Sequence, residues 1–201
     1  MANLSYKIKA KVLDVFGDIK VYPWPMFIVY SPKSFLVKAK QKRVAEKILL
    51  PGDIVQRKYV NYLDGKFIPG RYSHTGVYIG NGLVVHAISE GVCTIDILDF
   101  LECDAFCILR AKDYREKAVE LAKGFIGKKY DFSFELGPKR IYCHELGKLC
   151  YPDLIINTQQ PTLFGFTFGV EKKVLSESFL NSPDFHIVYE FYPLDKKHKS
   201  H

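Results

Sequence analysis

The sequence contains no long hydrophobic run, and we expect no secretory leader. Its most apolar window, residues 21–30, carries Pro23 and Pro25 and is too short to span a bilayer. Residues 1–20 alternate charged and apolar side chains and do not form the apolar core of a signal peptide. These absences predict a protein with no integral membrane segment, and we expect a cytoplasmic location.

The five cysteines form no CxxC pair of the metal-binding type. An odd number argues against a disulfide framework, and free cysteines are typical of a reducing compartment. The sequence implies no cofactor. Four of the five are expected to serve packing alone, namely Cys93, Cys103, Cys107 and Cys150.

Positive charge is in modest excess, because 29 Lys and Arg residues face 22 Asp and Glu residues, a net charge of +7. A basic balance suits an anionic partner. The basic residues are nevertheless scattered in twos and threes, as at Lys128 and Lys129, and no recognised nucleic-acid-binding motif accompanies them. We therefore expect a solvated basic surface and no nucleic acid partner. The sequence does not indicate the oligomeric state.

The composition is that of a globular protein. The 201 residues are 48% hydrophobic and 14% aromatic, enough for a sizeable core or an apolar binding groove. This length favours one domain. We predict a single domain over residues 1–201, made of an N-terminal extension and helix (1–45), a catalytic core (46–192) and a basic tail (193–201).

Hydrophobic spacing indicates strands followed by segregated helices, the pattern of an α+β fold. We expect an antiparallel sheet or small barrel packed against helices, with residues 153–183 irregular. The predicted helices are 34–50, 114–126 and a third from Cys143 to Pro152, with a short helix or turn at 96–102. The predicted strands are 54–59, several in succession within 72–112 (among them 105–110), and 185–192.

Two histidines flank a predicted hairpin turn at Gly80-Asn81-Gly82. With a three-residue loop, Ile79 pairs with Leu83, and His74 and His86 become diagonal neighbours on one face of the hairpin. A two-residue loop would place them on opposite faces. The other face is uniformly apolar and suits the core, so the histidine face is the one free for a site. Two strand histidines without a role are the alternative interpretation.

Cys143 follows the Gly137-Pro138 break and falls near the predicted start of a helix. Unpaired backbone N–H groups and the helix dipole stabilise a thiolate there, so we expect the pKa of this thiol to fall. The same N–H groups would stabilise an oxyanion, and a nearby imidazole would complete a Cys–His nucleophile. His144 points about 100° away around the helix and is an unsuitable base. A buried structural cysteine is the alternative interpretation.

Six motifs follow one another along the chain, namely Gly52-Asp53-Ile54-Val55, Phe67-Ile68-Pro69-Gly70, Ser73 to Gly80, Val85-His86-Ala87, Gly127 to Phe132 and Tyr142 to Leu146. This set, over residues 50–150, is similar to the circularly permuted papain-like NlpC-type cysteine hydrolases, in the YiiX/YaeF-like branch related to lecithin:retinol acyltransferase-like proteins. In that branch the histidine strand precedes the cysteine helix, and this chain has the same order.

The resemblance implies a role for each of four residues. Cys143 corresponds to the nucleophile, His74 to the general base, and His86 to the residue that orients His74. Tyr130 corresponds to an extra active-site tyrosine that positions the substrate or stabilises the oxyanion.

This chain departs from the branch at two positions. His144 stands where the branch often has Ser, and we expect little effect on the nucleophile itself. His86 stands where Glu is common, and a neutral imidazole orients a second imidazole less strongly than a carboxylate does. Glu90 is a spare carboxylate nearby that would orient His74 in its place.

The resemblance implies a cysteine hydrolase or acyltransferase that attacks an amide or ester carbonyl through a thioester on Cys143. The expected substrate is a peptide, an N-acyl amino acid or a lipid-like amide with a hydrophobic group. Phe164 to Phe168 and Trp24 are candidate apolar walls, although ordinary loop packing explains them more simply. Two alternatives stay open. One is a non-catalytic lipid- or peptide-binding module on the same fold; the other is a His₂Cys metal site formed by His74, His86 and Cys143.

Overall fold

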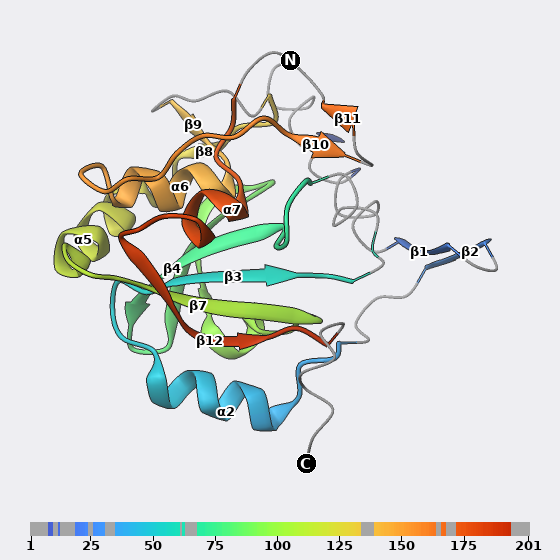
Figure 1. The fold of residues 1–201 in the computed structure, drawn as a ribbon, viewed down its shortest axis with the longest axis horizontal. Helices are drawn as coiled ribbons and strands as arrows, with labels where there is room; N and C mark the ends of the chain where they lie inside the picture. The colour runs from blue at the N-terminus through green and yellow to red at the C-terminus, as the bar shows by residue number, and fades with distance from the viewer. Residues whose placement is uncertain are drawn as a thin grey trace.

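The computed structural model of the chain describes residues 8–9, 12, 19–23, 26–30, 35–60, 62, 68–133, 139–163, 166–167 and 172–193. At its centre is a six-stranded antiparallel sheet in the order β12-β7-β3-β4-β5-β6 (Figure 1). The strands are β3 (Ile54–Lys58), β4 (His74–Gly80), β5 (Leu83–Ile88), β6 (Gly91–Asp96), β7 (Ala105–Ala111) and β12 (Phe185–Phe191).

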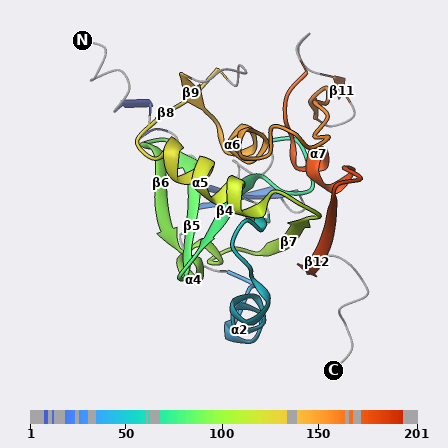
Figure 2. The same cartoon turned by 90° about the vertical axis from the view of Figure 1, so that its left-hand side faces the viewer.

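Helices cover both faces of this sheet (Figure 1 and Figure 2). On one face lie α5 (Arg115–Phe125), α6 (Cys143–Cys150) and α7 (Ser176–Leu180); on the other lie α2 (Ala39–Ile48) and α4 (Ile97–Phe100). The buried apolar residues therefore form two clusters. Val77, Val85 and Leu146 belong to the first cluster, and Val55, Val84 and Phe100 belong to the second.

The remaining strands are short and pair outside the main sheet. One of these pairs joins β8 (Lys129–Tyr130) and β9 (Arg140–Ile141). It matters most for the site described below, because β9 leads directly into α6 and fixes where that helix begins. The pairs are β1 (Ile19–Pro23) with β2 (Met26–Tyr30), antiparallel; β8 (Lys129–Tyr130) with β9 (Arg140–Ile141), parallel; and β10 (Thr162–Leu163) with β11 (Phe166–Thr167), antiparallel.

The α+β prediction is confirmed, and the long predicted helices and strands are found within a few residues of their expected bounds. The segment 96–102 is a helix, because the Asp96 carboxylate accepts a hydrogen bond from the Leu98 N–H at 2.7 Å and caps α4. Residues 153–183 are less irregular than expected, since they contain α7. There the Ser178 hydroxyl accepts from the Leu175 N–H at 3.0 Å and stabilises the first turn.

The β4–β5 register confirms that His74 and His86 share a face, by a different route from the expected one. The turn is a two-residue Asn81-Gly82 connection. A bulge at Ile79 then shifts the register by one residue, so that Gly76 faces His86. The extra residue restores the pairing that a three-residue loop would have produced.

The histidine face is more covered than expected, although His74 itself is only half-buried. Both faces of β5 are covered, and Val84 and Val85, which point to opposite faces, are each 0% exposed. His86 itself is 2% exposed. A strand that is buried on both faces reads as a continuous apolar run, so alternation alone does not reveal which face is open.

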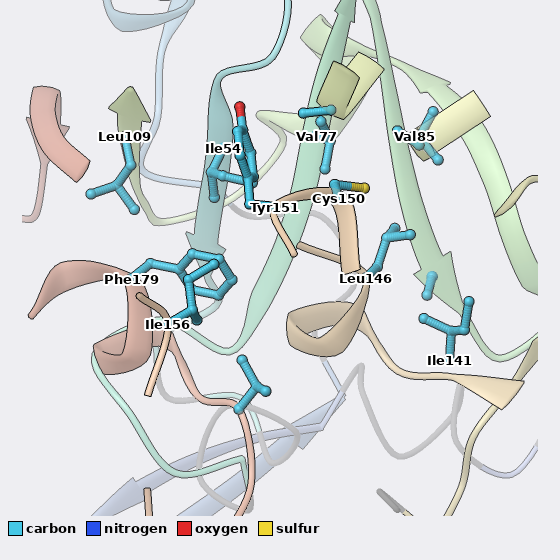
Figure 3. Packing of buried hydrophobic residues seen from close by; sticks show 14 of the residues in the cluster. Ile54, Val77, Val85, Leu109, Ile141, Leu146, Cys150, Tyr151, Ile156 and Phe179 are labelled. Carbon is cyan, nitrogen blue, oxygen red and sulfur yellow. The ribbon is translucent and has the colours of Figure 1, made fainter. Parts of the chain in front are cut away.

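α6 packs along β4 and β5 through its apolar side chains (Figure 3). Leu146 and Cys150, one turn apart on the helix, lie over the strands that carry Val77 and Val85. Cys150 is 1% exposed, which confirms it as a core residue. The five cysteines are all free, in agreement with the absence of a disulfide framework.

Some expected features lie outside the described residues. Trp24, most of the stretch 164–168 and the tail from residue 194 onward are among them. Every helix in the described part of the chain falls short of the length and hydrophobicity needed to cross a membrane.

Candidate active site

Two imidazoles meet at the end of the sheet where β4 begins. Nε2 of His74 lies 3.0 Å from Nδ1 of His86, within hydrogen-bond distance. The ring of Phe100, from α4, packs against both imidazoles at a centroid separation of 5.7 Å from each. This aromatic cover lowers the local dielectric and strengthens the hydrogen bond between the imidazoles. The structure thus joins two of the predicted site residues and adds an aromatic one.

Cys143 is the first residue of α6, where the sequence places it. Its thiol donates to the carbonyl oxygen of Ser73, at a sulphur–oxygen distance of 3.9 Å. A hydrogen bond from the backbone N–H of Thr75 also lowers the pKa of this thiol. The sulphur therefore lies against the backbone on either side of His74, although the two residues are far apart in the sequence.

A glycine lets the helix come this close to the strand. A Cβ added to Gly147 would lie 2.8 Å from the Phe179 ring and 3.2 Å from the Thr75 methyl carbon. Both separations are shorter than ordinary van der Waals contact, so only glycine fits at this position without a shift of its neighbours. The small residue thereby brings the first turn of α6 against the start of β4.

The resting thiol is protonated, contrary to the expectation of a lowered pKa. Burial raises the pKa of Cys143 to about 11, and its side chain is only 2% exposed. The N–H groups of Thr75, His144 and Cys143 itself, with the Arg57 guanidinium, lower the pKa but do not outweigh the loss of hydration. The position of Cys143 at the helix start correctly predicts that N–H groups lower the pKa of the thiol. It does not predict the larger effect of burial, which depends on the residues that pack over the thiol.

The two imidazoles are neutral as well. Burial, and then the Arg57 guanidinium, lowers the pKa of His86 to about 3. Burial, Arg57 and the imidazoles of His86 and His144 hold the pKa of His74 well below its usual value. A neutral His86 can accept a hydrogen bond at Nδ1 from the Nε2–H of His74. That tautomer leaves the Nδ1 lone pair of His74 available to take a proton.

We expect alkylation of Cys143 by iodoacetamide to keep accelerating above the free-thiol pKa of about 8.5. Only the thiolate reacts, and burial holds the pKa of this thiol at about 11. The measurement is the second-order rate constant as a function of pH, with mass spectrometry of the peptide that carries Cys143. The chain unfolded in urea is the control and should show the free-thiol midpoint. A rate plateau that begins below that midpoint in the folded protein would demonstrate a preformed thiolate–imidazolium pair.

Arg57 is a charged residue of the site that no sequence signal indicated. It faces His74 across the β3–β4 pair, and its guanidinium carbon lies 4.5 Å from the centroid of the Phe100 ring. Nη1 donates to the Phe100 carbonyl oxygen at 2.8 Å, and Nε is buried without a hydrogen-bond partner among the described residues. Its positive charge disfavours protonation of the neighbouring imidazoles.

Tyr130, the fourth predicted site residue, is buried close to the start of α6. It is 5% exposed, and in the parallel β8–β9 pair it lies opposite Ile141, two residues before Cys143. Its ring packs edge-on against Phe132 with a centroid separation of 5.2 Å. The structure thus places Tyr130 on the strand beside the one that leads into α6.

The alternatives for the histidine pair find less support. The Glu90 carboxylate accepts a hydrogen bond from the Ser89 hydroxyl at 2.8 Å, and it is His86 that contacts Nε2 of His74. Among the described residues, no group of three His, Cys, Asp or Glu side chains is arranged to hold a metal ion.

Two known proteins are similar to parts of this chain. The crystal structure of the metalloprotein YiiX from Escherichia coli O157:H7 superposes with a TM-score of 0.59 at 19% identity, covering 72% of this chain and 98% of that one. At that identity the likeness concerns the fold alone. A DeoD-type purine nucleoside phosphorylase of Oceanobacillus iheyensis is 37% identical over 67 residues, which is 30% of this chain and 28% of that enzyme. This chain thus matches well under a third of the phosphorylase.

A family model accounts for a much larger part of the chain. Residues 49–189 match the permuted papain-like amidase enzymes of the YaeF/YiiX, C92 family. The matched range contains the strands that carry His74 and His86 and the helix that begins with Cys143. It also agrees with the resemblance that the motifs carry and supports a cysteine hydrolase type of activity. The chain therefore belongs to the permuted papain-like amidase family of the YaeF/YiiX type.

Proposed function

We propose that the protein is a cysteine hydrolase that cleaves an amide or ester bond through a thioester on Cys143. The observation that carries this proposal is the position of the Cys143 sulphur beside the Ser73 carbonyl and the Thr75 N–H, the backbone on either side of His74. His74 is itself paired with His86 at 3.0 Å. Family membership supports an amidase type of reaction.

In the proposed acylation step, the Sγ–H bond of Cys143 breaks as the sulphur bonds to the substrate carbonyl carbon. The proton leaves its hydrogen bond with the Ser73 oxygen and moves to Nδ1 of His74. His74 then gives the proton to the departing amine or alcohol as the bond to the carbonyl carbon breaks. His86 stays neutral and accepts the Nε2–H of His74, which orients the ring and stabilises the transient imidazolium.

Deacylation repeats these steps with a different nucleophile. His74 removes a proton from the acceptor, whose oxygen or nitrogen bonds to the acyl carbon. The carbon–sulphur bond then breaks, and His74 returns the proton to the Cys143 sulphur. With water as acceptor the product is a carboxylic acid, and with another alcohol or amine the reaction is acyl transfer. Because the pKa of His74 is held well below its usual value, this base stays neutral into mildly acidic solution.

Replacing Tyr130 by Phe is expected to lower kcat by about 10²- to 10³-fold and to leave residual activity. We propose that the Tyr130 hydroxyl stabilises the oxyanion together with the backbone N–H of Cys143, because β8 runs beside the strand that leads into α6. The measurement is kcat for a p-nitrophenyl ester, with Tm recorded alongside. Tyr114→Phe, at a ring that is 52% exposed, is the matched control and should equal the wild type. An unchanged kcat in Tyr130→Phe would leave Tyr130 a packing residue.

The decisive experiment for the function is to trap the acyl-enzyme. The protein is mixed with p-nitrophenyl esters of increasing chain length, quenched in acid and digested for mass spectrometry. We expect the acyl mass on Cys143 in the wild type and its loss in His74→Ala. Adducts spread evenly over Cys93, Cys143 and Cys150 would reject catalysis.

The same ester series tests the substrate class. We propose a peptide, N-acyl amino acid or lipid-like amide with a hydrophobic acyl group, and aromatic rings stand near the site, Phe100 at the imidazoles and Phe132 at Tyr130. The acylation rate should rise with chain length, since each buried CH₂ contributes about 0.8 kcal/mol. A flat series would show that no apolar pocket receives the acyl chain.

A non-catalytic lipid- or peptide-binding module on the same fold is the second candidate. The observation that favours it is the buried, protonated state of the resting thiol, with its pKa raised to about 11. Such a module would bind the esters without forming a thioester. Binding of a long-chain ester without release of p-nitrophenol would therefore support the module and reject the hydrolase.

A further inference from the structure

The histidine beside the nucleophile is buried and hydrogen-bonded, although its place in the sequence indicates no role. His144 follows Cys143 in α6 and is 2% exposed. Its Nδ1 lies 2.6 Å from Oγ1 of Thr75, the residue that follows His74 in β4. The residue after the proposed nucleophile is thus hydrogen-bonded to the residue after the proposed base.

The Thr75 hydroxyl is held in turn by Gln56 of β3. Nε2 of Gln56 donates to Oγ1 of Thr75 at 3.3 Å and reaches the carbonyl oxygen of Ser176 at 3.4 Å. Gln56 and Thr75 face each other in the β3–β4 register, and both are 0% exposed. Because a buried polar group that loses its partner is costly, each member of this chain of hydrogen bonds restrains the next. The chain runs from α6 through β4 and β3 to the start of α7.

Thr75 acts on the Cys143 sulphur from two sides. A hydrogen bond from its backbone N–H lowers the pKa of the Cys143 thiol. Its hydroxyl is hydrogen-bonded to His144, the residue that follows Cys143 in the helix. Nε2 of His144 is buried without a partner among the described residues. A leucine at this position would pack without that unpaired polar atom, so the contact that accounts for an imidazole here is the one between Nδ1 and Thr75.

We infer that His144 is a positioning residue, which together with Thr75 and Gln56 forms a clamp that sets the Cys143 sulphur against His74. The inference rests on the proposed function, because the clamp acts only through the reaction of Cys143. A displacement of about 1 Å at a reacting atom costs about 10²-fold in rate. The clamp fixes α6 on β4 at the end of the helix where such a displacement matters. This replaces the expectation that His144 has little effect on the nucleophile.

The test compares acylation of Cys143 by p-nitrophenyl acetate in variants of the clamp. His144→Leu removes the hydrogen bond and should slow acylation about 10- to 100-fold. His144→Asn places an amide near the position of Nδ1, keeps the bond to Thr75 and should restore most of the rate. Thr75→Val should match His144→Leu, and the double variant should lose little more than either single one, because both remove the same interaction.

The matched control removes a buried hydrogen bond at the C-terminal end of α6. The Tyr151 hydroxyl donates to the Gly52 carbonyl oxygen, so Tyr151→Phe should lower Tm while acylation stays at the wild-type rate. Equal losses of acylation in Tyr151→Phe and His144→Leu would show a general loosening of α6 and overturn the clamp.

Other outcomes distinguish a failure of the clamp from a failure of the proposed function. If Cys143 is acylated at the same rate in the wild type and in His144→Leu, the clamp is rejected and the proposed function stands. A wild type that never acylates Cys143 rejects both. Should His144→Leu fail to fold, Thr75→Val carries the same comparison, because it changes one hydroxyl to a methyl group of similar size.

Discussion

Lowering the pH below about 6.5 is expected to destabilise the folded protein steeply. Burial lowers the pKa of His144 to about 3, and burial with the Arg57 guanidinium lowers that of His86 to about 3. Burial and the same guanidinium also hold the pKa of His74 well below its usual value. In the unfolded chain each imidazole takes up a proton near its ordinary pKa, whereas in the folded protein it stays neutral.

The direction of this pH dependence follows from the number of protons that the folded and unfolded states bind. Above about pH 6.5 both states are neutral at these groups, and stability does not depend on them. Below that value the unfolded chain binds more protons, so the free energy of unfolding falls with pH until the folded-state pKa values of about 3 are reached. His86 and His144 together give a slope of about 3 kcal/mol per pH unit. A domain stability of about 5–15 kcal/mol is exhausted within a few units of such a slope.

The measurement is a set of guanidinium unfolding curves, followed by circular dichroism, at several pH values from neutral to acid. His144→Asn removes one titrating ring and should reduce the slope by about 1.4 kcal/mol per pH unit. His186→Asn, which removes an exposed ring on β12, is the control for the loss of a histidine as such. A stability that stays flat from neutral to acid pH would mean that the rings are hydrated in the folded protein.

The shared face of His74 and His86 is predictable from sequence because side chains alternate along strands. The turn itself is not, since a two-residue turn with a bulge at Ile79 and a plain three-residue loop give the same pairing beyond the turn. The glycines around Asn81 permit either solution. Which one forms depends on what packs against the hairpin, and the local sequence does not contain that information.

The surroundings of the imidazoles are less predictable than the imidazoles themselves. Arg57 and Phe100 meet through a hydrogen bond between residues 43 positions apart, one on β3 and the other at the end of α4. A charged residue on a strand is typical of a solvated surface, and a phenylalanine is typical of any core. Their joint effect on His74 and His86 appears only once α2 and α4 cover that face of the sheet.

Cys143 shows the same limit. The start of the helix at Cys143 is predictable from the preceding Gly137-Pro138 break, and the structure has it there. The direction of the pKa shift of Cys143 is not predictable in this way. The N–H groups of the helix lower the pKa, and burial raises it by a larger amount. The motif specifies the dipole, and the packing of the whole domain specifies the burial.

Replacing Cys143 by Ala is expected to abolish the acyl-enzyme and to lower kcat for p-nitrophenyl esters by roughly 10⁶-fold. The proposed reaction loses the atom that forms the thioester. Cys150→Ala is the matched control, since Cys150 lies two turns further along the same helix and is 1% exposed in the core. It should lower Tm and keep kcat. Turnover that survives in Cys143→Ala would place the nucleophile elsewhere.

The raised thiol pKa makes a second variant informative beside this one. In His74→Ala no imidazole removes the proton, so the reaction depends on the fraction of thiol that ionises unaided. Because burial holds the pKa of Cys143 at about 11, the residual rate should rise about tenfold per pH unit until that pKa is approached. In Cys143→Ala the rate should show only the background of hydroxide attack. A residual rate in His74→Ala that ignores pH would show that His74 is not the base that the buried thiol requires.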